Sequence, residues 1–206
     1  MKSLILSNLF LGLVAAVPQY GDLSSPPRRF TIQSVSLIGS GCPAGTATVH
    51  VDRSGTIFEA SFSAYQVQTG PSIPASQWRK NCKLSLNMDY DPGFQFRLVG
   101  TDMSGYASIP DGISGQCINS FSFAGDNGDR IEYIVKFHGR NSGRFDLQST
   151  PGLSTWSSCE SNTSILNLNT ACELEPTNQR ALIAVDEVSG KLTIKCAIQW
   201  QRCLKK

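Results

Sequence analysis

Apolar and polar residues alternate in short runs from Phe30 onward, and Gly, Pro, Asn and Asp separate the runs. A period of two predicts β-strands with one buried face, because successive side chains of a strand point to opposite sides. The clearest runs lie at 47–51, 58–64, 82–100, 121–123, 131–137, 145–147, 166–174 and 182–200. Helical periodicity is absent from this part of the sequence.

Two of these runs are interrupted by turn residues. Asp91-Pro92-Gly93 divides 82–100, with a proline that restricts φ and a glycine that accepts positive φ. Ser189-Gly190 divides 182–200 in the same way. We therefore expect a hairpin at each place. Roughly ten short strands without crossover helices favour an all-β fold, an antiparallel β-sandwich of jelly-roll or Greek-key type closed by disulfides.

The N-terminal segment has the pattern of an export signal. Lys2 precedes an apolar run, and Val14-Ala15-Ala16 offers small residues for cleavage after Ala16. The run is well short of the roughly 20 residues that a membrane span needs. We expect a signal peptide at 1–16, an extended arm at 17–29 and a single domain at 30–206, in a secreted protein without a membrane span.

Charge excludes one class of partner. The 18 Lys and Arg residues nearly balance the 16 Asp and Glu residues, and the basic residues are scattered along the chain. Nucleic-acid binders concentrate basic residues on one face. We expect an extracellular monomer that binds no nucleic acid and needs no cofactor or metal.

The sequence contains seven cysteines, which are Cys42, Cys82, Cys117, Cys159, Cys172, Cys196 and Cys203. Export to an oxidising compartment favours disulfides over metal thiolates. Cys172 and Cys196 both fall on apolar strand faces, so we expect them to pair. The further expected bridges are Cys159 with Cys203 and Cys42 with Cys82. Cys117 then remains as a buried free thiol, with an intermolecular bridge as the alternative.

Five segments resemble successive motifs of a fungal secreted-protein family that is catalogued only as a domain of unknown function. They are Gly39-Ser40-Gly41-Cys42-Pro43-Ala44-Gly45-Thr46, Arg79-Lys80-Asn81-Cys82-Lys83-Leu84, Asp91-Pro92-Gly93-Phe94-Gln95, Trp156-Ser157-Ser158-Cys159 and Gln199-Trp200-Gln201-Arg202-Cys203. The resemblance implies a secreted, cysteine-bridged β domain and supplies no catalytic residue. The other three cysteines are additions in this chain, and Trp78 departs from a usually polar stretch.

Catalytic chemistry has few candidates. The two histidines, His50 and His138, fall on polar strand positions, so we expect them to face solvent. Glycoside hydrolysis needs two carboxyl groups flanking one bond. The candidates are Asp89, Asp91 and Glu132, although Asp91 opens a turn and Asp89 lies on a polar face. We expect no catalytic residue, and a carbohydrate-active enzyme is the weaker alternative.

Two loops resemble ligand-binding motifs only in part. Gly39-Ser40-Gly41 lacks the third glycine of a dinucleotide-binding loop and precedes a strand, so we expect a turn held by a disulfide. Asp126-Asn127-Gly128-Asp129 lacks the spaced oxygen ligands of a calcium loop and is expected to be a turn.

Aromatic residues at strand ends and in loops are the candidates for ligand stacking, namely Tyr65, Trp78, Tyr90, Tyr106 and Trp156. Asn162-Thr163-Ser164 is a sequon, so we expect a glycan on Asn162. These features favour a non-enzymatic protein that acts by surface recognition at the cell wall or against a host, as an effector does. The alternative is a module that binds cell-wall polysaccharide.

Overall fold

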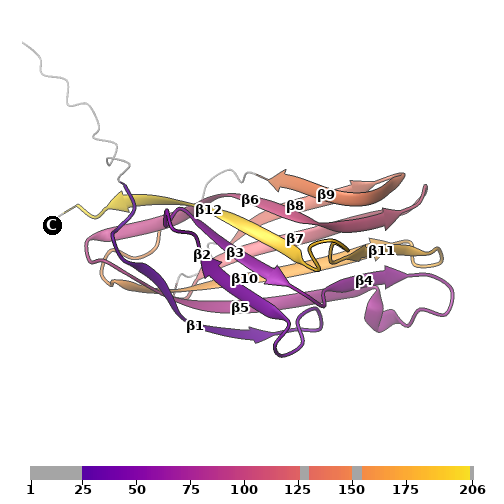
Figure 1. Ribbon diagram of the computed structural model, residues 1–206, viewed down its shortest axis with the longest axis horizontal. Helices are drawn as coiled ribbons and strands as arrows, with labels where there is room; N and C mark the ends of the chain where they lie inside the picture. Colours follow the sequence, from indigo (N-terminus) through magenta and orange to yellow (C-terminus); the bar gives the residue numbers. More distant parts are fainter. Residues whose placement is uncertain (1–24, 126–129, 150–154, 205–206) are drawn as a thin grey trace, which may run out of the picture.

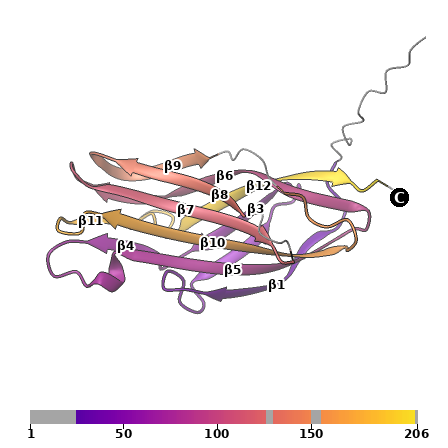
Figure 2. The same cartoon turned by 180° about the vertical axis from the view of Figure 1, so that it is seen from behind.

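The computed structural model describes residues 25–125, 130–149 and 155–204. They build two antiparallel sheets whose strands run along the length of the molecule (Figure 1). The first sheet contains, in order, β1 (Phe30–Ile38), β5 (Arg79–Tyr90), β10 (Thr163–Glu175), β7 (Ser114–Phe123) and β8 (Ile131–His138). Figure 2 shows this five-stranded sheet from β1 at one edge to β8 at the other.

The second, seven-stranded sheet is organised around one long strand. Its members are β2 (Ala47–Val51), β3 (Ile57–Phe62), β4 (Gln66–Thr69), β6 (Phe94–Ile109), β9 (Asn141–Ser149), β11 (Ala181–Ala184) and β12 (Leu192–Arg202). One side of β6 pairs first with β12 and then with β11, and the other side pairs with β9. β3 and β2 extend the sheet beyond β12, and β4 extends it beyond β11. A short 3-10 helix, η1 (Ala75–Gln77), precedes β5.

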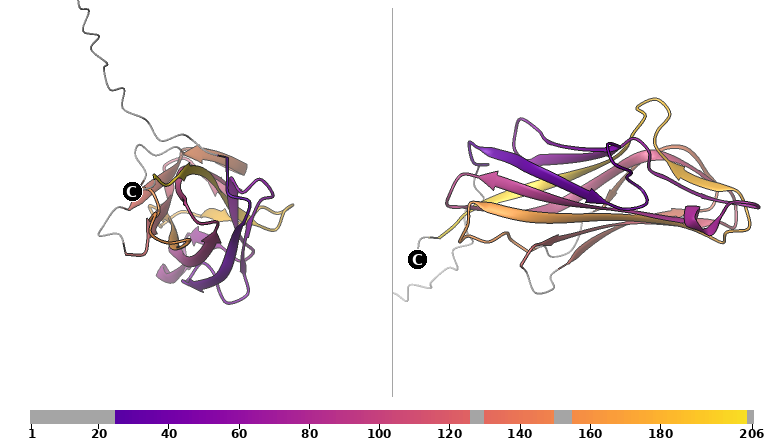
Figure 3. Two further views of the ribbon diagram at one scale, coloured as in Figure 1. Left: turned by 90° about the vertical axis from the view of Figure 1, so that its left-hand side faces the viewer. Right: turned by 90° about the horizontal axis from the view of Figure 1, so that it is seen from below.

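The expected fold class is confirmed, because these sheets form an antiparallel sandwich with three disulfides. The view along the molecule shows the sheets on either side of one interior (Figure 3, left). Buried side chains of both sheets fill this interior as one hydrophobic cluster. No helix in the described residues is long and apolar enough to cross a membrane. The predicted signal peptide and the first part of the predicted arm lie outside the described residues.

The two expected hairpins are wrong. β5 belongs to the five-stranded sheet and β6 to the seven-stranded sheet, so Asp91-Pro92-Gly93 carries the chain from one sheet to the other. Gly93 does adopt the expected positive φ, at 81°. β11 and β12, which are described in full, both pair with β6 and not with each other. Alternation identifies the buried face of a strand but not the strand beside it, so it cannot distinguish a hairpin from a crossing between sheets.

An aromatic cluster fills the end of the core near the β5–β6 turn. The Trp200 ring lies 4.9 Å from that of Phe30, 5.2 Å from that of Phe96 and 5.5 Å from that of Tyr90, measured between ring centroids. Its indole N–H donates to the Gly55 carbonyl at 2.7 Å, so the one polar atom of the buried ring is satisfied. Burial of each such side chain contributes about 1.5–3 kcal/mol to folding.

Two disulfides agree with the sequence-based expectation. Cys42 bonds to Cys82 and joins the segment after β1 to β5, and Cys159 bonds to Cys203 just after β12. The Gly39-Ser40-Gly41 segment forms the expected disulfide-held turn. A side chain at Gly39 would lie 2.2 Å from the Asn81 carbonyl oxygen, so the turn packs directly against β5.

The expected Cys172–Cys196 bridge is wrong, and so is the expectation of a free Cys117. Cys117 on β7 lies directly opposite Cys172 on β10, and these two residues form the third disulfide. Cys196 is on β12 in the other sheet, and it is the free, buried thiol of the described residues. Packed sheets are about 10 Å apart, whereas disulfides need Cα atoms within about 7 Å, so neighbours in one sheet pair more readily than residues facing across the core.

Candidate functional site

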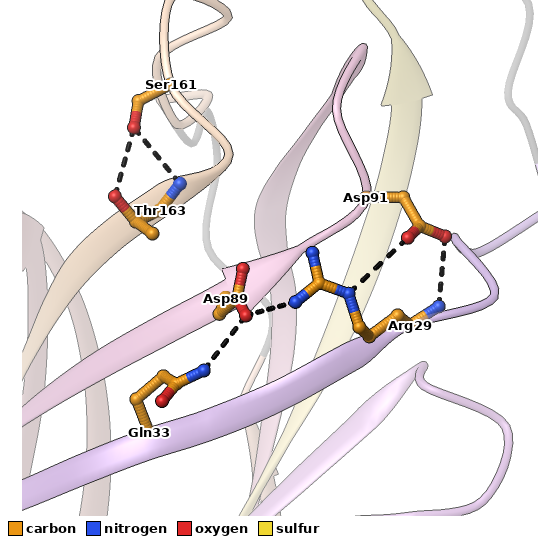
Figure 4. A network of polar contacts seen from close by, with 6 residues as sticks. All are labelled: Arg29, Gln33, Asp89, Asp91, Ser161 and Thr163. Carbon is orange, nitrogen blue, oxygen red and sulfur yellow. Dashed lines mark hydrogen bonds and ion pairs between the residues drawn. The ribbon is translucent and has the colours of Figure 1, made fainter.

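The predicted carboxylate pair Asp89 and Asp91 is held by the start of β1. The Arg29 guanidinium forms ion pairs with both carboxylates, and the Gln33 amide donates to Asp89 at 2.9 Å (Figure 4). The Arg29 backbone N–H also donates to Asp91 at 3.0 Å. Because these oxygens are occupied by protein donors, the pair anchors β1 to the end of β5.

The other predicted polar candidates lie apart from one another. Glu132 forms an ion pair with Arg130 at 3.0 Å on the edge strand β8. His50 is exposed opposite Glu59 on the seven-stranded sheet, and His138 is exposed on the five-stranded sheet. The structure therefore does not combine these groups into one site. The Asp126–Asp129 segment lies outside the described residues.

Two of the five aromatic candidates are wrong, because their rings are inaccessible. Tyr65 and Tyr90 are both 0% exposed. Tyr65 lies between the sheets, where its hydroxyl is 2.8 Å from the Lys80 carbonyl and accepts the Cys172 N–H at 3.2 Å. Burial raises the pKa of Tyr65. Strand ends lie at the ends of the sandwich, where these residues close the core instead of facing solvent.

The other three aromatic candidates are partly exposed. Trp78 follows η1, and its indole N–H donates to the Ile73 carbonyl at 3.1 Å. Trp156 lies beside the free edge of β6, where the Ser157 N–H donates to the Phe96 carbonyl at 2.8 Å. Tyr106 is on β6 itself. Trp156 and Tyr106 thus belong to the same strand region of the seven-stranded sheet.

Alternate residues of β6 turn their side chains away from the core, and their neighbours on β9 and β12 extend the same outward surface. We call this surface the β6 face. Its charged and aromatic members are Arg97, Asp102, Tyr106, Arg144, Asp146 and Lys195. Trp156 lies at its border, where the Arg97 guanidinium carbon is 4.6 Å from the centroid of the indole ring. This stacking holds both side chains at the surface.

A carboxyl pair lies near the middle of the β6 face. Asp102 is opposite Gln148 and Asp146 is opposite Ser104, so the two outward carboxyl groups are diagonal neighbours on paired strands. Interaction with Asp146 raises the pKa of Asp102, and partial burial adds to this effect, whereas nearby Lys195 lowers the pKa. One carboxyl of the pair therefore holds its proton to a higher pH than an isolated aspartate does.

Three hollows follow one another along β6. A hollow of 240 Å³ is lined by Asp102, Gln148 and Lys195 among others, and one of 270 Å³ by Ser104, Arg144 and Asp146 among others. The third and largest, 420 Å³, contains Tyr106 together with β4 and β11 residues such as Gln66 and Leu182. The β6 face thus offers a row of depressions with mixed polar and apolar linings and an aromatic ring at its far end.

The loop between β11 and β12 borders the middle hollow. The Ser189 N–H donates to Asp186 at 2.7 Å and lowers the pKa of that carboxyl. Asp186 also forms an ion pair with Arg144, with 2.5 Å between the charged atoms. The loop projects beyond the strands (Figure 3, right), and Val188 at its tip is 81% exposed. A ligand on the β6 face would meet this loop.

Asp102 and Asp146 were not among the candidates from sequence, because the alternation was followed only to residue 100. A register shift against β12 leaves Val99 as an extra residue of β6, so the buried positions change from Phe96 and Leu98 before it to Met103, Gly105 and Ala107 after it. Strict alternation continued from Phe96 and Leu98 would have assigned Asp102 and Tyr106 to the buried face, whereas the structure turns both outward after the irregularity at Val99. Asp146 required the β6–β9 pairing, which the sequence does not reveal.

The predicted glycan site, Asn162, lies in an exposed turn just before β10. Its backbone carbonyl accepts the Tyr90 N–H at 3.0 Å, which fixes the backbone while the residue stays exposed. Among the described residues, no group of three or more His, Cys, Asp or Glu side chains could hold a metal ion.

The fold and its bridges define a secreted, disulfide-bonded, extracellular β-sandwich protein. Residues 28–203 match the family model described as a domain of unknown function (DUF4360), and the chain belongs to this family. The resemblance identified in the motifs is therefore confirmed. A protein of Arthroderma benhamiae, described as an uncharacterized secreted protein, is 29% identical over 191 residues, which are 90% of this chain and 77% of that protein.

Solved structures with partial likeness include two carbohydrate-binding modules. TmCBM27, described as recognising mannan, has 8% identity and a TM-score of 0.34, and the match covers 84% of this chain and 99% of that one. TmCBM61, solved with β-1,4-galactotriose, has 8% identity and a TM-score of 0.28, with 84% and 90% covered. At scores this low, neither likeness supports a conclusion about the ligand of this chain.

Proposed function

We propose that this protein acts by surface recognition outside the cell, as a monomer and without catalysis, and that the β6 face is its recognition surface. One observation supports the choice of face. Charged, amide and aromatic side chains gather there around three adjoining hollows. Recognition needs groups that remain accessible after folding, and this face provides them on regular strands, which hold side chains in fixed positions.

The arrangement of carboxyl groups argues against hydrolysis of sugars. Asp89 and Asp91 are occupied by Arg29. Asp102 and Asp146 lie close enough for Asp146 to raise the pKa of Asp102. Glycosidases separate their two carboxyl groups by about 5 Å or more, because the scissile bond lies between them. Neighbouring carboxyl groups that interact this closely leave little room for that bond, so we assign the pair to ligand binding.

Affinity capture tests the proposed recognition surface. The oxidised, glycosylated protein is incubated with cell-wall extracts and with host tissue, beside the variants Lys195→Ala and Lys136→Ala. Both lysines are exposed strand residues, on the seven-stranded and the five-stranded sheet respectively. We expect the wild type and Lys136→Ala to retain the partner equally well. Lys195→Ala should bind it at least fivefold more weakly.

If Lys136→Ala bound the partner more weakly than Lys195→Ala did, the recognition surface would lie on the five-stranded sheet instead. Release of sugar or peptide fragments from the captured material during prolonged incubation would contradict the absence of catalysis. A binding module for cell-wall polysaccharide is the second candidate function, and the polar character of the β6 face favours it over a protein partner.

A further inference from the structure

The accessible aromatic rings of the β6 face lie far apart. Arg97, which stacks on Trp156, and Tyr106 are both outward residues of β6. At a rise of about 3.3 Å per residue, they are about 30 Å apart along the strand. A compact small molecule cannot contact both rings, whereas an elongated ligand lying along β6 can.

Hydrogen-bonding groups occupy the space between the rings. The two smaller hollows present the carboxyl groups of Asp102 and Asp146, the Gln148 amide and the Lys195 ammonium group. Ile57, Gly100 and Ala197 contribute small apolar surfaces to the first of them. This mixture of donors, acceptors and apolar patches matches the hydroxyl groups and C–H faces of sugar rings.

Charges on this face nearly cancel. The ionisable residues that line the three hollows are Asp102, Asp146, Asp186 and Glu187 with Lys195, Arg144 and Arg180. Arg144 is already paired with Asp186, and Lys195 lies opposite both Asp102 and Glu59 in the sheet. A polyanion or polycation would meet opposite and like charges alternately along β6. An uncharged ligand avoids this repulsion.

We infer that the β6 face binds a linear, uncharged polysaccharide that lies along β6. Trp156 and Tyr106 contact its sugar rings near the two ends, and the carboxyl pair and Gln148 accept and donate hydrogen bonds to its hydroxyl groups. This inference rests on the proposed function, because it names the ligand class of the same surface.

Binding isotherms test the inference with a soluble β-glucan, a mannan and a xylan as neutral probes, polygalacturonate as the anionic probe and chitosan as the cationic one. We expect at least one neutral polysaccharide to bind, and Trp156→Ala and Tyr106→Ala each to weaken it tenfold or more. The controls are Ile134→Ala and Ile165→Ala, exposed on the opposite sheet, which should leave binding within twofold. Thermal unfolding and circular dichroism verify that all variants fold.

Ligand length provides a second measurement. Oligosaccharides of the bound neutral polymer should gain affinity with each added unit until they span the distance between the two rings. In Tyr106→Ala, the affinity should stop increasing at a shorter chain length. Equal affinity for a disaccharide and the polymer would overturn the elongated binding mode.

The outcomes separate this inference from the proposed function. Binding of charged polymers alone, of no polysaccharide, or of a neutral one unaffected by the aromatic variants would overturn the inference. If the protein captures a protein partner, and Lys195→Ala and Trp156→Ala abolish this capture, the β6 face remains the recognition surface. The inferred polysaccharide ligand would then be wrong. Capture unaffected by every β6-face variant would refute both.

Discussion

At the scale of single residues, contact between like groups decides the properties of the β6 face. Two neighbouring carboxyl groups repel each other when both are ionised, so one of them holds its proton to a higher pH than an isolated aspartate does. Asp102 holds this position, because Asp146 and partial burial both raise its pKa. While Asp102 is protonated, the pair can donate as well as accept a hydrogen bond, which two ionised carboxylates cannot do.

The Asp102 proton should make stability depend on pH. Because the pKa of Asp102 is higher in the folded protein than the usual 3.8, the folded state binds this proton more tightly than the unfolded state does. The free energy of unfolding should therefore fall as the pH rises from about 3.8 through the raised pKa. Asp102→Asn should remove this fall in urea titrations, whereas Asp111→Asn, at an exposed turn, should preserve it. Equal slopes in wild type and Asp102→Asn would contradict the shift.

Cys196 should behave as a buried thiol. It is 0% exposed, and burial raises its pKa well above the usual value, so both access and ionisation oppose reaction. With the three disulfides intact, we expect no thiol to react with a disulfide reagent in the native protein at pH 8 and one thiol per chain to react in denaturant. Rapid labelling of the native protein would contradict the buried position.

At the scale of elements, the period-two alternation predicts most of the strands, because burial of one face depends on neighbouring residues alone. Partnership between strands depends on distant residues instead. Cys172 illustrates the difference. The sequence places it on the apolar face of a strand, but only the β7–β10 register shows that Cys117 is its neighbour. The candidate site has the same limitation, because Tyr106 and Trp156 were recognised separately while the strand that relates them was predicted too short.

The Cys117–Cys172 bridge should stabilise the five-stranded sheet. Replacing both residues by alanine should lower the free energy of unfolding by about 2–5 kcal/mol, as expected for removal of a native bridge from a secreted domain. Cys196→Ala, the control, should cost less because it removes no cross-link. Non-reducing peptide mapping of the wild type should recover Cys117 joined to Cys172, and a Cys172–Cys196 peptide would refute this pairing.

Arg29 should fix the beginning of β1. Arg29→Ala removes its ion pairs with Asp89 and Asp91, and because Arg29 is half exposed we expect a loss of about 1 kcal/mol in denaturant unfolding. Amide exchange of the first residues of β1 should accelerate. The neighbouring Arg28→Ala, also exposed, is the matched control and should change neither measurement. An unchanged exchange rate in Arg29→Ala would show that β1 is held by its strand pairing alone.

At the scale of the whole molecule, the three disulfides connect different parts of one sandwich. Their cysteines are 40, 55 and 44 residues apart, so each closes a long segment of chain. Such bridges are characteristic of secreted proteins. They restrict the unfolded chain, and the Cys159–Cys203 bridge also ties the Trp156 segment to the end of β12 beside the β6 face.

The mass of the secreted protein should report both predicted processing events. We expect the chain recovered from the medium of a eukaryotic host to begin at Val17 and to carry one N-linked glycan. Enzymatic deglycosylation should remove the added mass, and Asn162→Gln should abolish it. A different first residue would revise the cleavage site, and a glycan that persists in Asn162→Gln would contradict the modified position.

The position of β12 constrains when this protein can fold. β12 follows every other described strand in the chain, yet it lies inside the seven-stranded sheet between β3 and β6. Until β12 emerges, β3 lacks one neighbour and the first half of β6 has an open edge. Assembly of that sheet therefore has to wait until the end of the described chain is available, and the Cys159–Cys203 bridge, whose second cysteine follows β12, can close only then.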